Sequence, residues 1–119
     1  MLIFASLLLV LIALVHSVLG ERFILRPLFK RDNLPRLFGN DSFTKSTLRF
    51  AWHITSLAWL GFAALLLMLP DSRPLLLTST VVFFTSGLLA ACYTKGKHLS
   101  WLVFFLIAAL TLTQACTLS

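Results

Sequence analysis

Residues 2–19 read LIFASLLLVLIALVHSVL and contain no Lys, Arg, Asp or Glu. A helix needs about 20 apolar residues to cross roughly 30 Å of hydrocarbon. Residues 50–69, 75–93 and 99–116 have the same character and similar length. Their apolar side chains run all around the helix, without the polar stripe of a soluble amphipathic helix. The sequence therefore predicts an all-α membrane protein, with four transmembrane helices in an antiparallel bundle that forms one domain over residues 1–119.

The composition excludes the other broad classes of protein. Of the 119 residues, 59% are hydrophobic and 12% are charged. Soluble domains carry about 45–50% apolar and about 25% charged residues, and disordered chains are poor in large apolar side chains. No Ser-His-Asp set, paired carboxylates or Gly-rich phosphate loop is present, so an enzyme of this sequence would have to use its histidines or a cofactor.

The three connections between the predicted helices differ in length and charge. Residues 70–74 and 95–98 are tight turns, which make the last three helices antiparallel neighbours. Residues 21–49 are long and hold seven of the ten cationic side chains, for a net charge of +4. Because Lys and Arg are retained on the cytoplasmic side, we expect segments 21–49 and 95–98 in the cytoplasm and both termini on the outer side of the membrane.

The basic segment 21–49 mixes cations with bulky apolar residues, as in ERFILRPLFKR at 21–31. Such a mixture is typical of an amphipathic segment that lies in the headgroup layer and contacts anionic lipids. A surface for a membrane-protein partner is the alternative, and no aromatic-interleaved basic domain supports nucleic-acid binding. Residues 41 and 42 can cap a helix that continues into the second span. The predicted lipid or partner contacts are Arg22, Arg26, Lys30, Arg31 and Arg49.

The ionisable residues within the apolar stretches are His16 and His53, with His98 at a helix end. His16 lies about 7.5 Å before Glu21 along its helix, and His53 lies about 6 Å beyond Arg49 on a helix of opposite direction. All three imidazoles, with Glu21, are therefore expected in or near the cytoplasmic leaflet. Intramembrane ionisable residues are functional candidates by default.

Three interpretations of these residues remain open. In the first, His16 and His53, with His98 or Glu21, bind Zn or Fe, or the two histidines hold a haem axially. The spacing matches no recognised metal motif. In the second, a polar cluster of His16, Glu21, Arg22, Arg49 and His53 binds a lipid headgroup, a quinone or a proton. In the third, the histidines form hydrogen bonds to neighbouring helices and fix the packing.

Small residues predict where helices approach closely. Gly20 lies one turn from His16, and Gly87 with Ala91 has the small-x-x-x-small spacing of a helix contact. Cys92 and Cys116 are expected near opposite membrane surfaces, too far apart for a disulfide.

HSVLGER at 16–22 and LRFAWHITSLAWLGFAALL at 48–66 resemble small four-helix proteins of bacterial inner membranes. The resemblance covers nearly the whole chain, implies a bacterial origin and brings no established activity. We expect a non-catalytic accessory subunit or homo-oligomeric component of a membrane complex. The alternatives are a metal- or haem-binding protein for redox chemistry or metal handling, and a small oligomeric transporter or channel.

Overall fold

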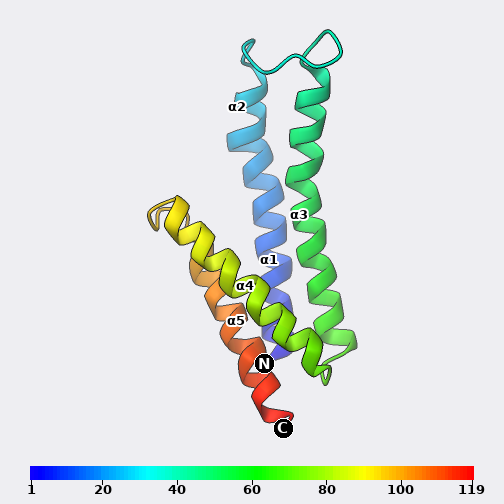
Figure 1. Ribbon diagram of the computed structural model, residues 1–119, viewed down its shortest axis with the longest axis vertical. Coiled ribbons are helices and arrows are strands. Elements are labelled where there is room, and N and C mark those ends of the chain that lie inside the picture. Colours follow the sequence, from blue (N-terminus) through cyan, green and yellow to red (C-terminus); the bar gives the residue numbers. More distant parts are fainter.

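The computed structural model describes residues 1–119 and is built from helices (Figure 1). The elements are α1 (Leu2–Gly20), the π-helical turn η1 (Glu21–Leu25), α2 (Arg26–Phe29), α3 (Ser42–Met68), α4 (Arg73–Tyr93) and α5 (Ser100–Thr117). Four continuous helical stretches are long and apolar enough to cross a membrane: Leu2–Phe29, Ser42–Met68, Arg73–Tyr93 and Ser100–Thr117. The prediction of an all-helical chain with four such helices is confirmed.

The first helix is longer than the sequence pattern predicts. After Gly20, η1 and α2 continue α1 to Phe29 alongside α3 (Figure 1). The 28 residues extend about 42 Å at 1.5 Å per residue. Residues 21–29 were predicted to belong to the connection 21–49, but they continue the first helix in the same direction. The non-helical part of that connection is therefore only residues 30–41.

Contacts with α3 explain why this extension stays helical. Leu25 is buried, with 2% of its surface exposed, and the Arg49 guanidinium lies 4.9 Å from the centre of the Phe29 ring. The Arg26 N–H donates to the Glu21 carbonyl, five residues earlier, which gives the wider π turn. Pro27 lies in the first turn of α2, where a missing N–H is tolerated, so the helix continues past it to Phe29.

The second long helix begins at Ser42, as the sequence predicts. Asp41 occupies the N-cap position, but its side chain forms no capping hydrogen bond. The Ser42 N–H donates instead to Asn40 Oδ1 at 3.0 Å, and Asp41 pairs with Lys45 Nζ at 2.9 Å. The cap therefore comes from the residue before the two that were predicted to supply it.

The long helices form two pairs. α3 packs along α1, α5 packs along α4, and contacts between α1 and α5 join the pairs, whereas α3 and α4 contact each other little despite their short connection (Figure 1). The expectation that the last three helices are successive neighbours is therefore wrong for α3 and α4. Ser6 Oγ donates to the Ala63 carbonyl at 3.1 Å within the first pair, and Thr80 Oγ1 lies 2.8 Å from Thr111 Oγ1 within the second.

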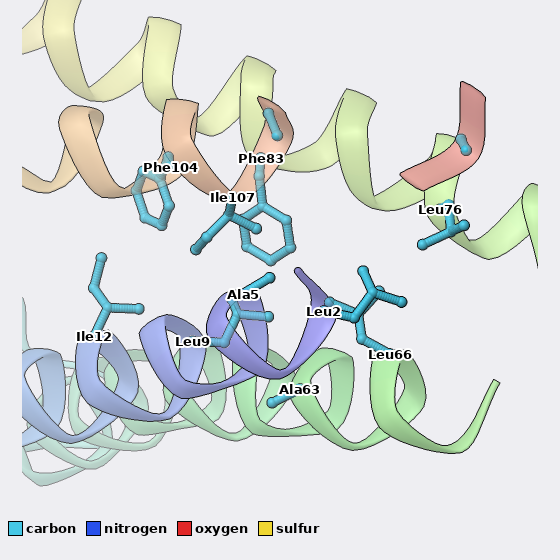
Figure 2. Packing of buried hydrophobic residues seen from close by; sticks show 12 residues of the cluster. Leu2, Ala5, Leu9, Ile12, Ala63, Leu66, Leu76, Phe83, Phe104 and Ile107 are labelled. Atoms are coloured by element: carbon cyan, nitrogen blue, oxygen red, sulfur yellow. The ribbon is translucent and has the colours of Figure 1, made fainter. Parts of the chain in front are cut away.

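The buried core lies between the two pairs. Figure 2 shows Leu9 and Ile12 of α1 facing Phe104 and Ile107 of α5, with Phe83 of α4 beside them. Most of the other large apolar side chains point outward, which is the arrangement expected of helices surrounded by lipid. The core residues are Leu2, Ala5, Leu9, Ile12, Ala63, Leu66, Leu76, Phe83, Phe104, Ile107, Ala108 and Ala115.

The two helix pairs extend to different distances along the long axis of the molecule. Both chain termini lie at one end of the molecule, and the α1–α3 pair extends past the α4–α5 turn at the other end (Figure 1). This end carries the basic residues of segment 21–49. It is also where the polar side chains of α1 and α3 meet.

Candidate functional site

Five side chains of the first helix and α3 form one continuous hydrogen-bonded row, which we call the His16–Glu21 network. His16 Nδ1 lies 2.9 Å from Ser56 Oγ, and Ser56 Oγ lies 2.7 Å from Ser17 Oγ. Ser17 Oγ lies 3.0 Å from His53 Nδ1, and His53 Nε2 lies 3.1 Å from Glu21 Oε2. The network therefore joins the two histidines of the apolar stretches to the first carboxylate of the chain.

The outer end of the network is an ion-pair cluster around Glu21. Arg49 Nη2 donates to Glu21 Oε1 at 2.7 Å, and Arg49 Nε donates to Oε2 at 3.2 Å. Arg26 Nε approaches the same carboxylate at 3.8 Å. A bidentate arginine fixes the orientation of a carboxylate as well as neutralising it, so Glu21 is held facing His53.

The inner end of the network is packed among aromatic rings. The His16 ring stacks on Trp52, with centroids 4.5 Å apart and planes within 4°, and meets the edge of Trp59 at 4.8 Å. Trp52 Nε1 donates to the His16 carbonyl at 2.9 Å. Gly20 makes this possible, because a Cβ there would overlap the Trp52 indole. Trp59 then contacts Phe104 of α5, which links the site to the core.

The depth of the network follows from helix geometry. Glu21 is 19 residues beyond Leu2, about 28 Å along the helix, which is close to the thickness of a hydrocarbon layer. His16 lies about 7.5 Å nearer the N-terminal end. The distance from Leu2 to Glu21 is therefore about one hydrocarbon thickness, and His16 lies within that length of helix.

An open pocket of about 390 Å³ lies beside the outer end of the network. It is lined by Ser17, Val18, Glu21, Arg22, Arg26 and His53. Arg22 and Arg26 are exposed and stand one turn apart, while the only carboxylate in the lining already pairs with Arg49. The pocket therefore has an excess of positive charge at the level where the helices leave the apolar region.

The four predicted metal ligands do not come together. His53 contacts Glu21, but His16 reaches them only through two serine hydroxyls, and His98 Nδ1 lies 2.6 Å from Ser100 Oγ at the start of α5. No group of three or more His, Cys, Asp or Glu side chains has an arrangement that could hold a metal ion. In this structure these residues are therefore hydrogen-bonding groups and do not form a metal-ligating set.

The other predicted residues lie outside the network. Lys30 is exposed, and Arg31 Nε donates to Asn33 Oδ1 at 3.0 Å in the connection that follows α2. Gly87 faces α5, where a Cβ would lie 2.7 Å from the Phe105 ring. Ala91 is half-buried near the end of α4. Cys92 and Cys116 are both free thiols.

Sequence reasoning missed the part that Ser56 and Trp59 play. Ser56 is 5% exposed and is the link between the two histidine-bearing halves of the network. Residues three or four apart share one face of a helix, so Arg49, His53 and Ser56 form one stripe on α3. That stripe, matched with Ser17 and Glu21 on the first helix, was the signal available in the sequence.

Comparison with known proteins gave no match. No protein-family model, no curated protein and no solved structure is significantly similar to this chain.

Proposed function

We propose that this chain is a non-catalytic component of a membrane assembly, which binds the anionic headgroups of the lipid bilayer through the basic end of its α1–α3 helix pair. The observation that supports this most directly is the pocket beside Glu21, where Arg22 and Arg26 stand exposed next to a carboxylate that already has a bidentate partner. Phosphate groups are the anions that lie at this depth in a bilayer.

The proposal includes an orientation. Seven of the ten cationic side chains lie in segment 21–49, and two more, Lys95 and Lys97, lie in the α4–α5 turn. The positive-inside rule therefore favours a bacterial inner membrane with both basic segments in the cytoplasm and both termini in the periplasm. Anionic lipids of the inner leaflet would then meet Arg22 and Arg26.

Native mass spectrometry of the detergent-solubilised protein with added phosphatidylglycerol tests headgroup binding. The Arg22→Gln/Arg26→Gln variant is expected to bind about 30-fold more weakly, since each cation near the surface contributes about 1 kcal/mol to attraction of an anionic lipid. The matched control is Lys95→Gln/Lys97→Gln, which removes the same charge from the other basic segment. An equal loss in both variants would show that the attraction is diffuse and that the pocket is not a site.

Membership of an assembly is tested separately, by purification in mild detergent followed by size-exclusion chromatography with light scattering. We expect either a defined oligomer of this chain or a stoichiometric membrane-protein partner. A lone monomer under conditions that retain bound lipid would contradict this part of the proposal.

A further inference from the structure

The hydrogen-bond chemistry of the His16–Glu21 network allows two complete arrangements of its protons. An ionised carboxylate only accepts hydrogen bonds, so His53 Nε2 carries the proton that lies between it and Glu21 Oε2. Each serine hydroxyl has one proton to donate and can accept as well. The two histidine contacts, at 3.0 and 2.9 Å, can be donated by either partner. Ser17 Oγ donates to Ser56 Oγ at 2.7 Å in the arrangement that the structure shows, which is the inward direction, and in the outward arrangement Ser56 is the donor of this bond.

In the inward arrangement His53 is doubly protonated and His16 is neutral. His53 Nδ1 donates to Ser17 Oγ, Ser17 donates to Ser56 Oγ, and Ser56 donates to His16 Nδ1. In the outward arrangement every one of these bonds is reversed, so that His16 is doubly protonated and His53 is neutral. No polar atom in the row loses its partner in either arrangement, which is the condition for the two to interconvert without leaving a buried group unsatisfied.

We propose that His53, Ser17, Ser56 and His16 form a proton relay between the charged cluster at Glu21 and the interior of the helix pair. The step is a concerted shift along three hydrogen bonds. The Nδ1 proton of His53 moves to Ser17 Oγ, the Ser17 proton moves to Ser56 Oγ, and the Ser56 proton moves to His16 Nδ1. One positive charge passes from His53 to His16, and every atom keeps its normal valence.

Charged and titratable groups are arranged unequally around the two ends. His53 faces Glu21, which is itself paired with Arg49, and the pocket beside it adds Arg22 and Arg26. His16 faces the indoles of Trp52 and Trp59. His53 is therefore the end that exchanges protons with the aqueous surface.

The inner end of the relay is open. His16 is half-buried and uses Nδ1 in the network, while its Nε2 forms no hydrogen bond to the protein. When a proton arrives at Nδ1 of His16, the ring can therefore release its Nε2 proton to a weak base in the apolar layer. In the reverse direction, a weak acid in that layer protonates Nε2 and the Nδ1 proton moves outward along the row. Ser17, His53 and Glu21 line the pocket beside the arginines, whereas Ser56 and His16 lie outside it, so a substitution at Ser56 tests the relay separately from lipid binding.

Solid-state nitrogen-15 NMR of histidine-labelled protein in phosphatidylcholine bilayers tests the relay. Near the pH at which the two rings share one proton, the Nδ1 signals of His16 and His53 are expected to be averaged by exchange in the wild-type protein. In Ser56→Ala the link is cut, and the two signals are expected to separate, with exchange at His16 slowed at least tenfold. Ser56→Thr keeps a hydroxyl at this position and is expected to restore the averaging.

The matched control is Ser6→Ala, which removes a buried serine of α1 whose hydroxyl bonds the Ala63 carbonyl outside the network. It should leave both histidine signals as they are in the wild type. Unchanged averaging in Ser56→Ala, or one static tautomer for each ring across the titration in the wild type, would overturn the relay. Circular dichroism of each variant distinguishes loss of the link from loss of the fold, and Ser17→Ala cuts the same row at a second point.

Discussion

Trp52 makes two contacts with His16. Its indole Nε1 donates a hydrogen bond to the His16 carbonyl at 2.9 Å, and its ring stacks on the His16 imidazole. The indole rests directly over Gly20, the residue one turn further along the same helix. One side chain of α3 thus holds the position of both the backbone and the ring of His16. The inner end of the network is therefore fixed by packing as well as by Ser56.

Gly20→Ala is expected to destabilise the protein, because the added Cβ overlaps the Trp52 indole and forces it away from His16. Overpacking of this kind costs about 1–3 kcal/mol. Thermal unfolding in detergent, followed by circular dichroism, measures the effect. Gly61→Ala is the matched control, because a Cβ on Gly61 meets nothing within 4 Å and Ala is the better helix former. Equal stability of the two variants would show that the packing of Trp52 on the first helix does not require a glycine at position 20.

The α4–α5 pair offers a second stability test. Thr111 is fully buried, and its Oγ1 lies 2.8 Å from Thr80 Oγ1. Thr111→Val keeps the shape and removes this bond between helices, for an expected loss of about 0.6–1.7 kcal/mol in the free energy of unfolding. Thr113→Val is the control, because the exposed Thr113 hydroxyl bonds only the Ala109 carbonyl of its own helix. Unfolding by sodium dodecyl sulfate compares the two, and an equal loss in both would mean that the Thr80–Thr111 bond contributes nothing.

The helices were predictable from the sequence because an uninterrupted apolar stretch of about 20 residues has few other stable structures in a membrane. The packing of the helices was not predictable, because apolar residues that face lipid and apolar residues that face a neighbouring helix are of the same types. The apolar residues of the stretch 50–69 do not indicate whether α3 packs on α1 or on α4, its neighbour in sequence. The extension to Phe29 was missed for a similar reason, since Pro27 and five charged residues at positions 21–31 are typical of both a helix end and an interfacial segment.

The site was predictable in its residue types. His16, His53 and Glu21 were selected because ionisable groups within or beside apolar helices are rare. Their connection was not predictable, because it depends on the rotation of the first helix against α3. That rotation makes Ser56 and Ser17 the bridge between His16 and His53, while His98 bonds to Ser100 outside the network. Three of the four predicted metal ligands therefore lie in a row of hydrogen bonds, and the fourth lies elsewhere.

Asp41, at the N-cap of α3, has a carboxyl group whose pKa is expected to depend on Lys45. The hydrogen bond and charge of Lys45 hold the pKa of Asp41 below its usual range. Because the folded-state pKa is lowered, the stabilising pair is fully present above the ordinary Asp value of about 3.9 and is lost as the pH falls through the lowered value. Lys45→Gln is expected to raise the pKa of Asp41, as measured by carbon-13 NMR of the side-chain carboxyl. Lys97→Gln removes the same charge far from Asp41, and a shift of equal size there would contradict the assignment to Lys45.

The proposed orientation is tested by cysteine labelling in spheroplasts, in a Cys92→Ser/Cys116→Ser background. Asp32→Cys lies in the connection between α2 and α3, and Asp71→Cys lies in the turn between α3 and α4, so the two variants make the same substitution at opposite ends of α3. With the basic segments retained in the cytoplasm, a membrane-impermeant maleimide added from outside is expected to label position 71 and not position 32. Permeabilised cells should label both, which shows that each thiol is reactive. Labelling of position 32 in intact spheroplasts would show that the orientation is the reverse of the one proposed. Arg22, Arg26 and the outer end of the relay would then lie on the periplasmic side.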